Sequence, residues 1–271
     1  MKDPTQPIES GSTAKIKGTW RKAILGLGIV LLWLPIVQVL CLRWVNPPTT
    51  MPRLLWQLKY AFHPEKKSMP IRWLDLKDTP DDFVDAVIYA EDLSFFEHHG
   101  FDFGAIKTAI HESQVTGKPP RGASTITQQC ARSTFLWQGR SWIRKGLEAY
   151  YSIWMELLLS KKRILTIYAN VIELGDGVYG LEAGAYHHFG VSGKSLNAEQ
   201  LSKLLAIMPN PKRWNPNDLP PAPQARQLWI LDHINSLHGN RISTQWQRYP
   251  QGVIIMPANP PPTAAEIDRA R

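Results

Sequence analysis

Two glutamates in unlike surroundings are the residues of this sequence best suited to acid–base chemistry. Glu91 lies in the stretch AEDLSFFEHHGFD, residues 90–102, and Glu148 lies in RKGLEAYY, residues 144–151. Two carboxylates can divide the work of sugar transfer when one is held ionised and the other is desolvated. The elements that carry these two residues therefore decide whether the chemistry is available.

Glu91 continues the buried face of a helix predicted over residues 79–91. Thr79 and Pro80 are typical of a helix start, and apolar residues recur from Phe83 at the spacing of one helical face. Glu91 follows Phe83 by eight residues and so falls on that face, where desolvation raises the pKa of an unpaired carboxyl. The alternative is a frayed helix end with Glu91 turned to water, and this stretch alone does not decide between the two.

Glu148 has two cations on its own helical face. Arg144 precedes it by four residues and Lys145 by three, so both can pair with it on one helix. One interpretation is a surface ion pair, which contributes little to stability. The other is partial burial, because Tyr151 follows one turn later beside an apolar stripe. A carboxylate held ionised in this way would complement a desolvated Glu91.

Other chemistries find little support in the sequence. It contains no HExxH or CxxC motif, no Gly-rich phosphate loop of the Walker type and no Gly-x-Ser-x-Gly elbow. His98 and His99 are adjacent, and neighbours on a helix point in different directions, so they do not form a chelating pair. We therefore predict no metal site built from the side chains of the protein.

The 271 residues, with a formal net charge of +8, suffice for one sizeable domain and an appendage. Positive charge is concentrated between residues 121 and 163, where the only acids are Glu148 and Glu156. Such a segment indicates an anionic partner, which is nucleic acid, lipid head groups or a phosphorylated substrate. The basic residues are Arg121, Arg132, Arg140, Arg144, Lys145, Lys161, Lys162 and Arg163.

Residues 23–42 form an uncharged apolar run that, as a helix, would cross the roughly 30 Å core of a bilayer. More Lys and Arg precede the run than follow it, so the positive-inside rule places the N-terminus in the cytoplasm. A cleaved signal peptide, a lipidated Cys41 and a buried core helix are the alternatives. The length of the run, the large Leu40 before Cys41 and the basic flank favour an uncleaved anchor.

The chain is therefore expected to divide into a cytoplasmic tail (1–22), a transmembrane anchor (23–43) and an exported domain (44–271). Residues 1–20 are polar, and we expect them to be disordered. From residue 79 onward strand signals are sparse, so we predict a mainly α fold. Helices are expected over 79–91, from about 103, from a cap at Ser124 or Thr125, over 140–160 as a long buried helix, after a cap at Ser160, over 196–209 and over 224–238.

Three successive stretches resemble the motifs of the peptidoglycan glycosyltransferases, glycosyltransferase family 51. They are AEDLSFFEHHGFD, RGASTITQQCARSTFL and RKGLEAYYSIWMELLLSKKRILTIYANVIELGDGVYGLEAGAYHHFG, and the match covers about residues 80–215. The single anchor and the absence of a transpeptidase domain resemble the monofunctional members of the family. The sequence departs from the family pattern at Cys130, Ser133 and Ala169, and none of these removes an acid or a cation.

This resemblance implies a lysozyme-like fold with a single N-terminal transmembrane helix, in the cell inner membrane, with the catalytic domain in the periplasm. It implies that lipid II and a growing lipid-linked glycan chain are joined by β-1,4 bonds, with inversion at the donor sugar and release of polyprenyl diphosphate. The implied partners are the membrane and proteins of cell-wall synthesis and division, and not nucleic acid. No organic cofactor is expected.

In the family's scheme Glu91 would deprotonate the 4-hydroxyl of the acceptor, and Glu148 would support the departing diphosphate through neighbouring cations or a divalent cation, Mg or Mn. Charged Arg and Lys suit a diphosphate leaving group. Asp92 and Glu97 are expected to face away from the buried stripe and to tolerate amides. The substrate-binding residues implied by the resemblance are Asp92, Phe95, His98, Gly100, Ser124, Thr125, Gln128, Gln129, Arg132, Arg144 and Lys145.

Two other functions use the same features. A lytic murein hydrolase of lysozyme-like fold would employ the same pair of carboxylates, but it has no diphosphate leaving group for the basic segment to bind. A non-catalytic scaffold that recognises a lipid-linked precursor would leave Glu91 without a purpose. The products formed from lipid II and from murein separate these alternatives.

Overall fold

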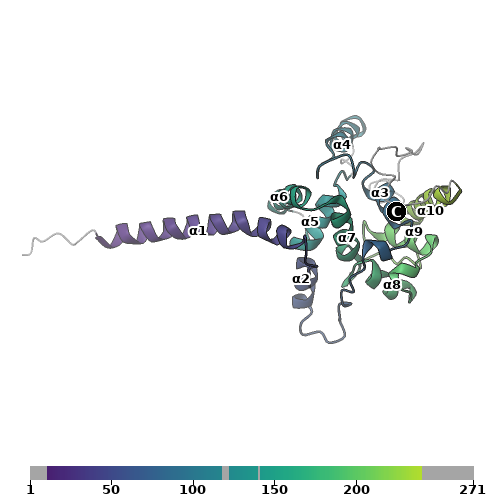
Figure 1. The fold of residues 1–271 in the computed structure, drawn as a ribbon, viewed down its shortest axis with the longest axis horizontal. Helices are drawn as coiled ribbons and strands as arrows, with labels where there is room; N and C mark the ends of the chain where they lie inside the picture. Colours follow the sequence, from purple (N-terminus) through teal and green to yellow (C-terminus); the bar gives the residue numbers. More distant parts are fainter. Residues whose placement is uncertain (1–10, 118–121, 140, 240–271) are drawn as a thin grey trace, which may run out of the picture.

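The structure is a computed structural model that describes residues 11–117, 122–139 and 141–239. The described part is mainly helical, as predicted, and Figure 1 shows a long N-terminal helix, α1 (Gly11–Cys41), projecting from a domain of shorter helices. The remaining described elements are α2 (Met51–Lys59), η1 (Leu76–Asp78, a 3₁₀ helix), α3 (Phe83–Glu91), α4 (Phe103–Thr116), α5 (Ile126–Phe135), α6 (Trp142–Leu158), α7 (Lys161–Val171), β1 (Glu173–Gly175), β2 (Val178–Tyr179), α8 (Leu181–Phe189), η2 (Gly193–Ser195, also 3₁₀), α9 (Ala198–Ile207) and α10 (Pro221–Gly239).

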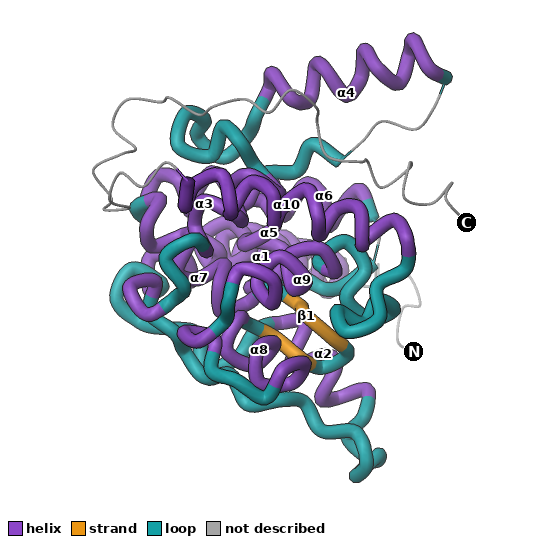
Figure 2. Tube along the Cα trace, turned by 90° about the vertical axis from the view of Figure 1, so that its right-hand side faces the viewer, coloured by secondary structure: helices purple, strands orange, loops and turns teal. Residues whose placement is uncertain are grey.

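One cluster of buried apolar side chains connects α3, α5, α7, α9 and α10. α5 packs on both α6 and α7, α9 packs on α10, and α10 packs on α3. Phe83, Leu204 and Ile230 have no exposed surface, and burial of such side chains contributes about 25 cal/mol for each Å² removed from water. α4 lies at the edge of the domain in two perpendicular views, and Ala109 is its buried residue (Figure 1 and Figure 2).

Capping side chains explain where most helices of the site begin. Thr125 starts α5, its hydroxyl accepting from the Gln128 N–H, and Ser160 starts α7 by accepting from the Arg163 N–H. Both starts agree with the prediction. Neither α2 nor α8 is among the helices predicted from the sequence, although Thr50 and the proline that follows Met51 are a recognisable helix start for α2.

α3 begins at Phe83 and not at residue 79 as predicted. The Thr79 hydroxyl donates to the Leu76 carbonyl at 2.7 Å and so closes η1, and it does not accept from a helix start. A turn then carries the chain to Phe83, whose N–H donates to the Pro80 carbonyl at 2.9 Å. The end of the helix at Glu91 agrees with the prediction.

α6 buries a charged pair and exposes some of its apolar side chains, so the prediction of a helix buried along its apolar face holds only in part: Tyr151 is buried, but other residues of the stripe are not. Trp142, Ile143 and Leu157 are 92%, 74% and 68% exposed. Buried charges require partners, and exposed apolar surface indicates contact with something other than water. The buried residues of α6 are Arg144, Glu148, Tyr151, Ser152 and Met155.

The last turns of α1 are packed on the domain. Val39 and Leu42 belong to the buried cluster, and the Tyr151 hydroxyl donates to Gln38 at 2.6 Å. Arg163 Nε donates to the Leu42 carbonyl at 2.7 Å, which satisfies a group at the C-terminus of the helix. The end of α1 is therefore part of the folded domain.

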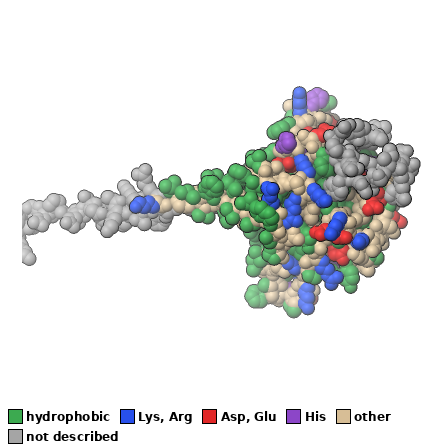
Figure 3. Space-filling model, in the orientation of Figure 1, with side chains coloured by type: hydrophobic (Ala, Val, Ile, Leu, Met, Phe, Trp, Pro, Cys, Tyr) green, Lys and Arg blue, Asp and Glu red, His purple; other side chains and the backbone are tan. Residues whose placement is uncertain are grey.

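α1 already begins at Gly11, so the expected disorder of residues 1–20 is wrong from that residue onward. Polar residues can extend a helix that has formed, because propagation costs less than nucleation. Figure 3 shows hydrophobic side chains along the described part of α1 and on the adjoining surface of the domain.

Among the described residues, no helix combines the length and the apolar character that a membrane span requires.

Three of the expected segments include residues or side chains that the structure does not describe. Several side chains of the expected anchor (23–43) lie outside the described set, as do residues 1–10 of the expected tail and residues 240–271 of the expected domain.

Candidate active site

Glu91 is the last residue of α3, and its side chain contacts both α5 and α10. Gln129 Nε2 donates to Glu91 Oε2 at 2.8 Å, and Arg226 Nη2 donates to Oε1 at 2.6 Å. The side chain is only 14% exposed and is paired, so Glu91 continues the buried face of α3, and the alternative of a frayed end with Glu91 turned to water is wrong. A carboxylate oxygen can accept more than one hydrogen bond, so Glu91 can still accept from a substrate hydroxyl.

Glu148 is fully enclosed in the described structure. Arg144 Nη1 donates to its Oε2 at 2.7 Å, and Lys145 Nζ donates to its Oε1 at 2.5 Å. The side chain of Glu148 has no exposed surface, whereas that of Lys145 is 41% exposed. The interpretation as a surface ion pair is therefore wrong, and burial is deeper than expected. Of the three charges, Lys145 is the one that can meet a substrate.

A continuous series of hydrogen bonds joins the two glutamates. Gln129 Nε2, which donates to Glu91, also donates to the Ser124 carbonyl at 3.4 Å. Lys145 Nζ donates to Ser124 Oγ at 3.2 Å and, on its other side, to Glu148. The structure thus brings both acids together with Ser124, Gln129 and Lys145 into one site.

A divalent cation does not fit the residues present at Glu148, because both carboxylate oxygens already accept from a cation. In the part of the chain that the structure describes, no group of three or more His, Cys, Asp or Glu side chains could hold a metal ion. Mg or Mn stays a prediction from the resemblance.

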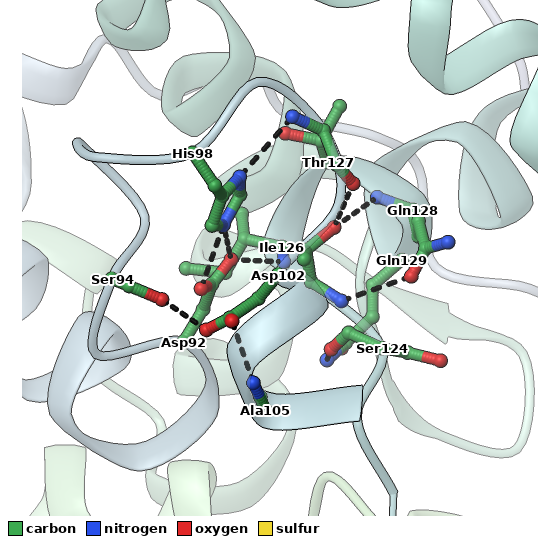
Figure 4. A network of polar contacts seen from close by, with 12 residues as sticks. Asp92, Ser94, His98, Asp102, Ala105, Ser124, Ile126, Thr127, Gln128 and Gln129 are labelled. Carbon is green, nitrogen blue, oxygen red and sulfur yellow. Dashed lines mark hydrogen bonds and ion pairs between the residues drawn. The ribbon is translucent and has the colours of Figure 1, made fainter. Parts of the chain in front are cut away.

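Asp92 ties the loop after α3 to the start of α5 (Figure 4). Its carboxylate accepts from the Ile126 N–H at 2.8 Å and from His98 Nε2 at 2.9 Å, while His98 Nδ1 accepts from the Gly100 N–H at 3.1 Å. A carboxylate at a helix N-terminus is stabilised by the helix dipole. Because Asp92 is buried, the expectation that it faces away from the buried stripe is wrong, whereas Glu97 is exposed as expected.

Other residues expected to bind substrate are buried and shape the loop between α3 and α5. Phe95 has no exposed surface. Gly100 has a φ of 89°, and an added Cβ there would lie 3.1 Å from Glu156 Cγ, so the position requires glycine. Its carbonyl accepts from the Thr125 hydroxyl at 2.7 Å, and Gln128 completes the cap of α5. These residues hold the loop and the start of α5 in place, and their contact with a substrate stays a prediction from the resemblance.

The basic segment serves two different purposes. Lys161 pairs with Glu156 at 2.8 Å, and Arg163 holds the end of α1, so both stabilise packing. Arg132, half-buried on α5, and Lys145 remain as cations beside the site. Arg121 and Arg140 lie outside the described residues.

Tyr168 and Arg226 complete the surroundings of Glu91, and the sequence analysis singles out neither. The Tyr168 hydroxyl donates to Gln129 Oε1 at 3.0 Å, and burial raises the pKa of Tyr168 well above its ordinary value. Arg226 is the only Lys or Arg in the sequence of α10. An arginine within a largely apolar helix could have been recognised, because a buried cation needs a carboxylate partner.

The fold and the site define a class of protein: a helical enzyme with a partly exposed carboxylate at one end of a polar chain and cations at the other. Such an arrangement suits proton removal from a hydroxyl together with departure of an anionic group.

Comparison with known proteins makes the assignment more specific. Residues 61–235 match the family model described as Transglycosylase. The biosynthetic peptidoglycan transglycosylase of Ectopseudomonas mendocina is 42% identical over 82% of this chain and 93% of that protein. Its namesake in Xylella fastidiosa (strain 9a5c) is 40% identical over 87% and 97%, and that in Pseudomonas aeruginosa is 40% identical over 78% and 91%. The chain belongs to the transglycosylase family.

Proposed function

We propose that this chain is a peptidoglycan glycosyltransferase that polymerises glycan strands, with lipid II as the acceptor and a lipid-linked glycan as the donor. The observation that carries the proposal is the series of hydrogen bonds that connects Glu91 with Glu148. It passes through Gln129, Ser124 and Lys145. It joins a carboxylate able to accept a proton to a cation able to hold a diphosphate. Membership of the transglycosylase family supports the same reaction.

In the proposed step Glu91 takes the proton of the acceptor's 4-hydroxyl while the hydroxyl oxygen attacks C1 of the donor sugar. The bond from C1 to the diphosphate breaks with inversion, and polyprenyl diphosphate leaves with the electron pair. Lys145 and Arg132 offset the charge that develops on the diphosphate. Glu148, which is enclosed, acts as a positioning residue through Lys145 and Arg144. The lysozyme-like arrangement stays a prediction from the resemblance.

The products formed from two substrates test this function. The full chain in detergent, supplied with labelled lipid II, is expected to yield polymer that a gel separates by size. Shortened glycan from added murein would favour the lytic hydrolase instead. If neither substrate changes, the chain is a scaffold that only recognises the precursor.

Removing a cation beside the site should weaken binding of lipid II. Arg132→Ala and Lys145→Ala are each expected to raise the Kd about tenfold or more, because a charge-assisted contact to phosphate contributes roughly 1.5–3 kcal/mol. Binding is measured in the Glu91→Gln background, so that turnover does not consume the ligand. Lys203→Ala, which removes the same charge from the surface of α9, is the matched control. If both site variants bind lipid II as tightly as the Glu91→Gln background does, residues other than Arg132 and Lys145 bind the diphosphate.

We further propose that residues 23–43 anchor the chain in the cell inner membrane as a single pass, with the domain in the periplasm. The apolar run and the hydrophobic surface that continues from α1 onto the domain support this (Figure 3). Exposed Phe103 and Ile110 on α4, with Trp142 and Ile143 on α6, are suited to contact lipid as well. Proteins of cell-wall synthesis and division stay predicted partners.

Two truncations separate anchoring from folding. Deleting residues 1–31 should remove most membrane association, because the remaining apolar run is shorter than the roughly 20 residues that a span needs. Deleting residues 1–44 should do the same and also lower the Tm, because Val39, Leu42 and the carbonyl bound by Arg163 are lost. Fractionation and thermal unfolding measure the two effects. Full sedimentation of the shorter chain with membranes would contradict the anchor, and equal Tm values would contradict the docking of α1.

A further inference from the structure

Arg226 is buried, with 7% exposure, where α10 meets the end of α3. Its Nη2 donates to Glu91 Oε1 at 2.6 Å and to the Ala90 carbonyl at 2.9 Å. Ala90 and Glu91 are the last two residues of α3, where carbonyls without helical partners give the helix a partial negative charge. A carboxylate is unfavourable beside this negative end of the helix. The positive guanidinium of Arg226 offsets both the Glu91 carboxylate and the partial charge of the carbonyls at the end of α3.

Aromatic stacking holds α10 against α3 and thereby fixes Arg226. Tyr89 of α3 stacks on His233 with ring centroids 3.6 Å apart, and on Trp229 with centroids 4.0 Å apart. Arg226, Trp229 and His233 are separated by three and four residues, so they share one face of α10. Burial lowers the pKa of His233 below its ordinary value of 6.5, which keeps the stacked ring neutral at pH 7.

The second oxygen of Glu91 is held from the opposite direction. Gln129 donates to it, and the buried hydroxyl of Tyr168 donates to the amide oxygen of Gln129 at 3.0 Å. This contact fixes which end of the amide faces the carboxylate. Glu91 is therefore clamped between an amide on α5 and a guanidinium on α10.

We propose that Arg226 is a positioning residue for the transferase reaction, keeping the Glu91 carboxylate charged and fixed, so that α10 is part of the catalytic apparatus. The inference rests on the proposed role of Glu91 as the base. Besides Glu91 and Arg226, the charged or titratable groups that act on Tyr168 in the described structure are Arg132 and Cys130 of α5. Burial raises the pKa of Tyr168 and of Cys130, so both are neutral at pH 7. Arg226 is the cation that hydrogen-bonds to the carboxylate in the described structure.

Two substitutions separate the charge of Arg226 from its shape. Arg226→Gln removes the charge but keeps a donor for the Ala90 carbonyl, and Arg226→Lys keeps the charge without the planar fork. In the glutamine variant the rate of lipid II polymerisation at pH 7 is expected to fall about tenfold or more. The acid limb of its rate–pH profile should move to higher pH, because loss of the cation favours the protonated carboxyl. The lysine variant should lose less rate and keep the acid limb of the wild type.

Gln227→Ala is the matched control, because it removes the 3.1 Å hydrogen bond from α10 to Ser202 of α9 and leaves the contacts of α10 with α3 and Glu91 in place. It is expected to lower the Tm and to leave the acid limb in place. Suppose that the wild type polymerises lipid II and that Glu91→Gln does not. An acid limb in Arg226→Gln that matches the wild type would then overturn the inference about Arg226 but not the proposed function. A wild type that forms no polymer would overturn the proposed function itself.

Thermal unfolding gives a second test that does not depend on activity. Glu91→Gln, Arg226→Gln and the double variant form a cycle, and the double variant should lose less stability than the sum of the single losses. Additive losses would overturn the pairing. Should Arg226→Gln not fold, Arg226→Lys decides: a reduced rate with an unmoved acid limb supports the inference, and a wild-type rate overturns it.

Discussion

Glu91→Gln should reduce polymerisation of lipid II by about 10²–10⁴-fold while leaving the fold and substrate binding in place. The amide matches the carboxylate in size, and the Gln129 and Arg226 side chains that hold Glu91 are unchanged. What the amide cannot do is accept the proton of the attacking hydroxyl. A modest fall in Tm is also expected, since Arg226 loses its counter-charge.

Initial rates with labelled lipid II, together with its Kd, check this result. Glu97→Gln is the matched control, because it makes the same chemical change at an exposed position of the same motif and should leave the rate unaltered. If Glu91→Gln polymerises lipid II at nearly the wild-type rate, Glu91 is not the base. Glu148 then becomes the candidate, although it would have to leave its enclosure to reach a substrate.

Local features of this chain could be predicted from its sequence, because they depend on residues one turn apart. Thr125 and Ser160 cap their helices as expected, and Glu148 pairs with Arg144 and Lys145 at the expected spacing. The two acids were likewise recognisable from their unusual neighbours. A cap or a pair of this kind depends on residues that are close in sequence and not on which other element packs against them.

Features that depend on contacts between distant segments could not be predicted in the same way. Arg226 meets Glu91 across 135 residues of sequence, and no helical period connects the two. Helical spacing continued past Glu91 predicts that Asp92 faces away from the buried stripe, whereas the helix ends at Glu91 and the Asp92 side chain accepts from the Ile126 N–H. Sequence spacing specifies faces within an element but not which other element covers them.

α6 shows the same limit most clearly. Its apolar residues recur at helical spacing, and the usual inference is that such a stripe faces the core. Here Tyr151 is buried together with Arg144 and Glu148, but Ile143 and Leu157 of the same apolar stripe are exposed. The period is the same for a stripe that meets the core and for one that meets lipid, so the pattern indicates an amphipathic helix without indicating which side is the interior.

Glu148→Gln should lower both stability and activity, because Glu148 neutralises a buried cation. Arg144 is 11% exposed, and without the carboxylate its charge is left unpaired in the interior. Breaking such a pair costs roughly 3 kcal/mol, which lowers the Tm of a domain of this size by roughly 6–12 °C. The rate should fall about tenfold or more as well, because Lys145 loses the partner that holds it beside Ser124.

A second substitution tells whether the lost activity is only lost folding. In Glu148→Gln/Arg144→Met neither member of the buried pair carries a charge, so most of the stability should return. Activity should stay low, since Lys145 still lacks its carboxylate and the site has lost a further cation. Thermal unfolding and initial rates of the two variants, with Arg144→Met alone as reference, measure this separation. If activity returned together with stability, Glu148 would be needed for the fold alone, and the anionic leaving group would have to be held by cations that do not depend on it.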